Sequence, residues 1–82
     1  MTLEILTPEK KLYSGEANLV QLPGIDGLFE ILNNHAPIIS ALGNGILKFK
    51  NAEGETNLRI NGGFVECLNN QVIVCAEGGS VV

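Results

Sequence analysis

The sequence contains no tryptophan, one tyrosine, three phenylalanines and only five basic residues. Nucleic-acid-binding domains usually concentrate Lys and Arg in a stripe with aromatic residues between them. Here the basic residues are dispersed along the chain, and the formal net charge is −4. This composition argues against a nucleic-acid-binding surface and, for the same reason, against electrostatic attachment to an anionic membrane.

Long hydrophobic runs are also missing. No stretch approaches the ~20 apolar residues that a membrane-spanning helix needs, and the first residues, MTLEILTPEKK, place charges inside the apolar stretch, unlike a signal peptide. The chain of 82 residues is 45% hydrophobic and 17% charged, which is typical of a globular domain rather than a disordered one. We therefore expect a single small folded domain.

Residues suited to catalysis are scarce. The only histidine is His35, the only aspartate is Asp26, and there are three serines. Ser40 and His35 would form a nucleophile and base pair only if the fold brought them together. Asp26, Glu30 and His35 follow no common metal-ligand spacing. The sequence therefore predicts no enzyme, no metal site and no cofactor.

Two cysteines raise the question of a disulfide. If Asn69-Asn70 is the two-residue turn of a hairpin, Cys67 pairs with Val72 and Cys75 pairs with Phe64. Side chains alternate between the two faces of a strand, so the cysteines point to opposite sides of the sheet. We predict that both are free thiols.

The hydrophobic pattern repeats every two residues, and turn signals recur about every 8–12 residues, which indicates strands rather than helices. We predict an all-β fold, a two-sheet, mainly antiparallel β-sandwich of about eight to ten short strands. The sandwich domain is expected over residues 1–77 and a flexible C-terminal tail over residues 78–82. Leu12–Leu22 is expected to be one long extended segment with a bulge or bend at Gly15.

Two segments are apolar on both faces. They are Ala36–Leu42 and the last hairpin, whose outward side would carry apolar residues among its polar ones. The predicted core residues are Leu47, Phe49, Leu58, Ile60, Val65, Cys67, Val72 and Val74; the expected outward set is Phe64, Glu66, Leu68, Gln71, Ile73 and Cys75. Two interpretations remain open: the chain covers these faces itself, or they form a partner interface.

Several segments match a known family in order along nearly the whole chain. They are LEILTPEKKLYSGEA at residues 3–17, PGIDGLFEILNNHAP at residues 23–37, INGGFVEC at residues 60–67 and NQVIVCAE at residues 70–77. The chain resembles the N-terminal β-sandwich of the epsilon subunit of F-type ATP synthases. It departs from the family pattern at Glu30, where glycine is common, and at Asn33, where proline is common.

The resemblance implies a non-catalytic rotor subunit that links the gamma subunit to the c-ring, peripherally bound at the cytoplasmic face of the bacterial inner membrane, with no bound nucleotide. It implies gamma-subunit contacts at His35, Ala36, Pro37, Ile38 and Ser40, and c-ring contacts at Thr7, Asp26, Gly27 and Leu28. The C-terminal helical hairpin that restrains ATP hydrolysis in many members has no counterpart in these residues, so we expect no such restraint from this chain.

A small all-β carrier or adaptor module of the biotinyl or lipoyl type is the alternative. Such a carrier presents its modified lysine at an exposed hairpin tip. Here Lys48 and Lys50 lie within a predicted strand, and the nearest tip, Ala52-Glu53-Gly54, has no lysine.

Overall fold

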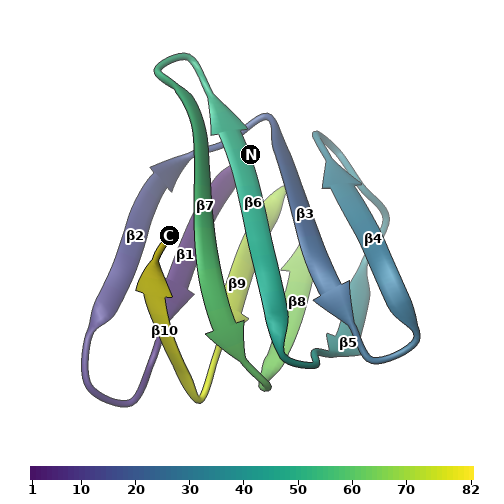
Figure 1. Cartoon of the computed structure of the whole chain (residues 1–82). Helices are drawn as coiled ribbons and strands as arrows, with labels where there is room; N and C mark the ends of the chain where they lie inside the picture. The colour runs from purple at the N-terminus through teal and green to yellow at the C-terminus, as the bar shows by residue number, and fades with distance from the viewer.

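The computed structural model describes all residues, 1–82, and contains ten strands in two five-stranded sheets that stack face to face (Figure 1). The first sheet has the order β2 (Lys11–Glu16), β1 (Thr2–Leu6), β9 (Gln71–Cys75), β8 (Phe64–Leu68), β5 (Ile38–Ala41). The second has the order β10 (Gly78–Val81), β7 (Gly54–Asn61), β6 (Gly45–Asn51), β3 (Leu19–Gly24), β4 (Gly27–Leu32). All pairings are antiparallel except β1 with β9. The predicted sandwich is confirmed.

The core lies between the two sheets and consists of 17 buried hydrophobic residues, with no buried polar side chain among them. All eight residues predicted for the core belong to it. Strands β1, β3, β6, β7, β8 and β9 contribute alternate residues to it, because side chains alternate between the faces of a sheet, whereas β2, β5 and β10 contribute none. The alternation is clearest in β8, where Val65 and Cys67 are buried and their neighbours are exposed.

The last hairpin has the predicted register. Cys67 pairs with Val72 and Phe64 pairs with Cys75. Asn69 and Asn70 have φ angles of 52° and 61°, the left-handed conformation that a two-residue type I′ turn requires. Both cysteines are free: Cys67 is buried, and Cys75 is half-buried on the outer face. Burial raises the pKa of the Cys67 thiol by disfavouring its charged thiolate.

We expect a thiol reagent such as iodoacetamide to modify Cys75 in the folded protein and to leave Cys67 unmodified, because the thiolate is the reactive form and a buried cysteine is inert. Intact-mass analysis at pH 8 should show a single adduct. Both cysteines lie in one tryptic peptide, residues 60–82, so fragmentation of that peptide by tandem mass spectrometry should place the adduct on Cys75. In denaturant both cysteines should react. Equal modification of the two thiols under native conditions would contradict the opposite facing of these side chains.

The raised pKa of the Cys67 thiol also makes the free energy of unfolding depend on pH. Its pKa is raised in the folded state, so its contribution to stability is complete below the ordinary thiol pKa and is lost as the pH rises through the higher folded value.

The expectation of one long strand over Leu12–Leu22 is wrong. The chain crosses from the first sheet to the second at Ala17-Asn18, between β2 and β3. The Ala17 amide donates to the Met1 carbonyl at 3.0 Å and the Asn18 amide to the Lys50 carbonyl at 2.8 Å, so consecutive amides bond to different sheets. The bulge or bend expected at Gly15 is not found there either: the irregularity in the pairing of β1 with β2 lies elsewhere.

That irregularity lies near the other end of β2. Ile5 pairs with Tyr13 while Leu6 pairs with Lys11, which leaves Leu12 as the extra residue. Gly15 instead lies under the Tyr13 side chain, since a Cβ at this position would come within 2.6 Å of the phenol oxygen.

The expected flexible tail is instead mostly strand. Gly78–Val81 forms β10, which pairs with β7 at the edge of the second sheet from Gly78↔Asn61 to Val81↔Leu58. Gly79 allows a close approach there, because a Cβ would lie 3.0 Å from a Leu12 methyl group and 3.1 Å from the Arg59 carbonyl oxygen. Backbone pairing creates this strand, and a Gly-Gly-Ser composition does not reveal it.

Candidate interaction surfaces

The segment between β4 and β5 carries three of the residues predicted to contact the gamma subunit, His35, Ala36 and Pro37. Side-chain and backbone bonds hold it in place: the Asn70 Oδ1 accepts a hydrogen bond from the Asn34 amide at 2.7 Å, and the His35 amide donates to the Leu32 carbonyl at 3.2 Å. The His35 Nδ1 lies 2.6 Å from the Ala36 carbonyl oxygen, so the imidazole forms a hydrogen bond within its own turn. Ala36 and Pro37 are exposed.

Strand β5 divides the remaining predicted residues between its two faces. Ile38 is partly buried and packs against the core, and Ser40 is also partly buried. Ile39, between them, is 73% exposed, the largest exposure among the large hydrophobic residues. Sequence reasoning named Ile38 among the predicted contact residues and did not name Ile39, the more exposed of the two. The alternation of the strand indicated that Ile38 and Ile39 lie on opposite faces. It did not indicate which of the two faces is outward.

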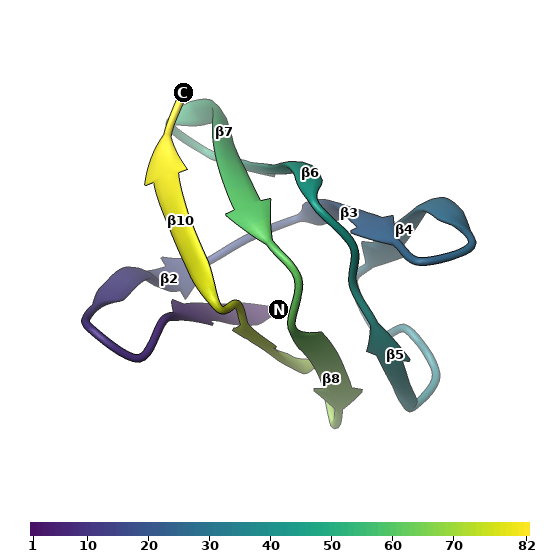
Figure 2. The ribbon, with the colours of Figure 1, turned by 60° about the horizontal axis from the view of Figure 1, so that its bottom comes forward.

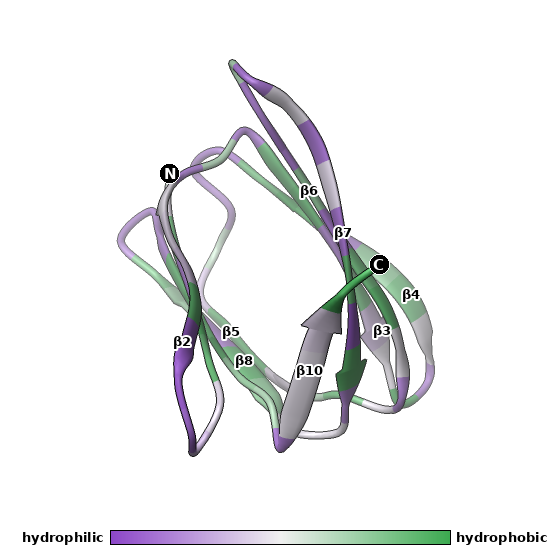
Figure 3. Cartoon of the chain, turned by 60° about the vertical axis from the view of Figure 1, so that its left-hand side comes forward, coloured by the Kyte–Doolittle hydropathy of each residue, from purple (hydrophilic) through white to green (hydrophobic).

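The outer face of the first sheet is largely apolar over β5, β8 and β9, and the chain does not cover it there. Ile39, Phe64 and Leu68 are 73%, 49% and 48% exposed, and Ile73 and Cys75 on β9 are half-buried beside them. Figure 3 colours much of β5 and β8 as hydrophobic, in contrast to the hydrophilic β2. We call these five residues the apolar face. Of the two open interpretations, coverage by the chain itself is wrong for this face.

The apolar face is hollowed between β5 and β8. The hollow has a volume of about 350 Å³ and is lined by Pro37, Ile38, Ile39, Glu66, Cys67 and Leu68. Exposed apolar surface of this kind on a small domain usually marks a protein contact.

The residues predicted to contact the c-ring lie at one end of the sandwich. Thr7 is in the β1–β2 turn, and Asp26, Gly27 and Leu28 form the β3–β4 turn and the start of β4. Figure 1 places both turns at its lower end, on opposite sides, and Figure 2 brings this end forward. The structure therefore places the four residues at the same end without bringing Thr7 to the other three.

The β3–β4 turn exposes large apolar side chains. Its Ile25 and the adjacent Leu28 are each 66% exposed. Ser40 lines a hollow together with Asp26, Gly27 and Leu28, so one residue predicted for the gamma contact lies beside three predicted for the c-ring contact. The Thr7 hydroxyl, in contrast, bonds within its own turn, to the Lys10 carbonyl at 3.0 Å and the Lys10 amide at 3.1 Å.

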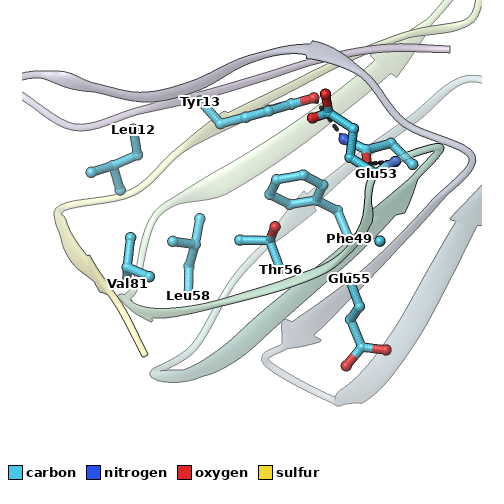
Figure 4. Close-up of a pocket in the computed structure, with 10 residues that line it drawn as sticks. Leu12, Tyr13, Phe49, Glu53, Glu55, Thr56, Leu58 and Val81 are labelled. Carbon is cyan, nitrogen blue, oxygen red and sulfur yellow. Dashed lines mark hydrogen bonds between the residues drawn. The ribbon is translucent and has the colours of Figure 1, made fainter.

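A third hollow, of about 160 Å³, opens between the sheets beside β2, β7 and β10 (Figure 4). The Tyr13 ring lies over the Phe49 ring with centroids 4.3 Å apart, and the Asn51 Nδ2 donates to the Tyr13 hydroxyl at 3.1 Å. That hydroxyl donates to the Glu16 carbonyl at 2.8 Å. The Tyr13 hydroxyl and the Asn51 amide are thus bonded to each other, and the hollow lies at the edge of the sandwich.

The ionisable residues do not converge. No group of three or more His, Cys, Asp and Glu side chains is positioned to hold a metal ion, so Asp26, Glu30 and His35 are not brought together. The Ser40 hydroxyl donates to the adjacent Ala41 carbonyl at 3.4 Å and His35 bonds to Ala36. The chain has no helix of the length and hydropathy needed to cross a membrane.

These features define a class: a small two-sheet β-sandwich with one bare apolar outer face. The family model for the ATP synthase delta/epsilon chain β-sandwich domain matches residues 1–79. The chain belongs to this family.

Curated relatives agree. The ATP synthase epsilon chain of Leptospira borgpetersenii is 37% identical over 81 residues, which cover 99% of this chain and 64% of the relative. That of Chlorobaculum tepidum is 42% identical over 77 residues, which cover 93% of this chain and 88% of the relative. The chain thus spans less than two thirds of the Leptospira protein. The carrier alternative is not favoured, since these relatives are ATP synthase epsilon chains.

Solved structures share the fold. A chain of the Euglena gracilis mitochondrial ATP synthase, in a structure of its OSCP, F1 and c-ring, superposes with a TM-score of 0.89 at 18% identity, covering 96% of this chain and 51% of that chain. A chain from the central stalk and c-ring structure of the Tetrahymena thermophila mitochondrial ATP synthase superposes with a TM-score of 0.80 at 20% identity. The match covers 98% of this chain and 65% of that chain.

Proposed function

We propose that this chain acts as a non-catalytic epsilon-type subunit of the central stalk in a proton- or sodium-translocating F-type ATP synthase. In this role it binds the gamma subunit and rests on the c-ring, at the cytoplasmic face of the bacterial inner membrane. Membership of the delta/epsilon family and the names of the curated relatives support the assignment.

The observation that carries the gamma contact is the apolar face of the first sheet. Its most exposed residue, Ile39, lies on β5 between the predicted contact residues Ile38 and Ser40. The gamma contact therefore includes the outward side of β5 and the hollow beside it, while Ile38 supports that strand from inside. The c-ring contact is assigned to the end that carries the exposed Ile25 and Leu28.

Replacing Ile39 by aspartate should weaken binding of the purified cognate gamma subunit by at least about tenfold. Loss of an interface anchor commonly costs more than 1–2 kcal/mol, and 1.4 kcal/mol corresponds to a factor of ten in affinity. Isothermal titration calorimetry of the gamma subunit with wild-type and variant chains measures the change. Ile38 is unsuitable for this test, because an aspartate there would also disturb the core.

Val81→Asp is the matched control. Val81 is 72% exposed, almost the same as Ile39, but it lies on β10 at the far edge of the other sheet. Its replacement should leave gamma binding unchanged. If the two variants bind the gamma subunit equally well and both remain folded by circular dichroism, the assignment of the gamma contact to β5 is wrong.

A further inference from the structure

One charged residue stands within the apolar face. Glu66 is exposed at the middle of β8, between Phe64 and Leu68 on the same side of the strand. In the register of the sheet it is opposite Ile39 on β5 and Ile73 on β9. Directly opposed side chains have Cβ atoms about 4.5–5.5 Å apart, so the carboxylate is flanked on both sides by isoleucine.

No base of this chain pairs with Glu66. The three ion pairs of the structure involve other carboxylates. The nearest acid along the same row, Glu4 on β1, lies opposite Ile73 and is paired with Lys11 at 3.4 Å. Lys48, Lys50 and Arg59 lie on strands of the second sheet. Glu66 is thus an unpaired negative charge in apolar surroundings, whereas Glu4, on the far side of Ile73, is paired with Lys11.

We infer that the gamma subunit presents a lysine or arginine to Glu66 when it covers the apolar face, an inference that rests on the function proposed above. Covering this face would remove water from the carboxylate, and an unpaired desolvated charge is costly. A basic residue on the partner removes that cost and fixes the register of the contact.

The same charge argues against a second copy of this chain as the occupant. A two-fold symmetric contact uses the same patch on both partners, so it would bring two Glu66 carboxylates into one interface. The apolar face has no basic residue to neutralise these two carboxylates, and the net charge of −4 on each copy adds to the repulsion.

The test compares gamma-subunit affinity for Glu66→Gln, Glu66→Lys and a control, Glu53→Lys, in the exposed β6–β7 turn of the other sheet. Neutralising one partner of an interfacial charge pair should weaken binding about tenfold, and reversing its charge should weaken binding about 100-fold. The control should bind like wild type. A Lys→Glu or Arg→Glu scan of the gamma subunit should then find one position that restores affinity for the Glu66→Lys chain.

The outcomes separate this inference from the proposed function. If Ile39→Asp weakens gamma binding but both Glu66 variants bind within about twofold of wild type, the inference of a basic gamma-subunit residue opposite Glu66 is wrong. The assignment of the contact surface then stands. If Ile39→Asp also binds normally, the contact surface itself is wrong. Sedimentation of the wild-type chain as a dimer that Ile39→Asp dissociates would identify a second copy as the occupant and overturn the inference. Thermal unfolding of each variant verifies that it is folded.

Discussion

Replacing Gly63 by alanine is expected to lower the free energy of unfolding by about 2–5 kcal/mol. Gly63 precedes β8 and has a φ angle of +107°, which L side chains rarely adopt at a cost of roughly 1–2 kcal/mol. A Cβ here would also collide with the Cys75 carbonyl oxygen and lie 2.8 Å from the Ala76 Cα. Both contacts are with backbone that is held by strand pairing, and overpacking of this kind costs about 1–3 kcal/mol more.

Such a loss is large for a domain of this size. Stability of about 0.05–0.15 kcal/mol per residue gives a total of roughly 4–12 kcal/mol for a chain this long. Urea unfolding followed by circular dichroism measures the change, with linear extrapolation to water. We expect the thermal midpoint to fall by about 8 °C or more, since 1 kcal/mol shifts a domain of 60–100 residues by about 4–8 °C.

Gly54→Ala separates backbone strain from the collision. Gly54 has a similar φ angle, +126°, but a Cβ at this position meets nothing within 4 Å. Its replacement should cost only the conformational part, about 1–2 kcal/mol. If Gly63→Ala is no more destabilising than Gly54→Ala, the close approach of the Gly63 and Cys75 backbones is not what requires glycine.

Replacing Leu3 by alanine is expected to cost about 3–5 kcal/mol, the range of fully buried leucines whose loss leaves a cavity. Leu3 is 0% exposed in β1, an inner strand of the first sheet, between Gly15 on β2 and Val72 on β9. Because strands flank β1 on both sides, the sheet has little freedom to collapse into the space. The same urea experiment measures the effect.

Leu28→Ala is the matched control for this prediction. It removes the same atoms from a leucine that is 66% exposed in β4, so the free energy of unfolding should change by no more than about 0.5 kcal/mol. A comparable loss for the two variants would mean that the buried core does not dominate the stability of this sandwich. Leu28→Ala should also be a stable variant with which to test the proposed c-ring contact.

Local patterns in the sequence were sufficient to predict the last hairpin. Alternation placed Val65 and Cys67 inward, and Asn69-Asn70 fixed the turn and therefore the register of β8 with β9. These features depend on neighbours along the chain, so periodicity and turn chemistry determine them. The free state of both cysteines followed from the same register.

The edges of the sheets could not be predicted in the same way. Gly78–Val81 became β10 because the edge of β7 was available to pair with it, and Leu12–Leu22 broke at Ala17-Asn18 because the chain changes sheets there. Both events depend on which strands lie nearby in space. Neither glycine-rich composition nor an extended hydrophobic run carries that information.

The sequence by itself determined the fold class, eight of the 17 core residues and the family resemblance, because these follow from alternation along the chain and from ordered motifs. Only the tertiary structure decided which face of β5 is outward: Ile39 is exposed and Ile38 packs against the core. It alone placed Glu66 between Ile39 and Ile73 without a base. The sequence of a strand that is apolar on both faces does not distinguish the two faces. Only the packing of one sheet on the other determines which face remains in contact with water.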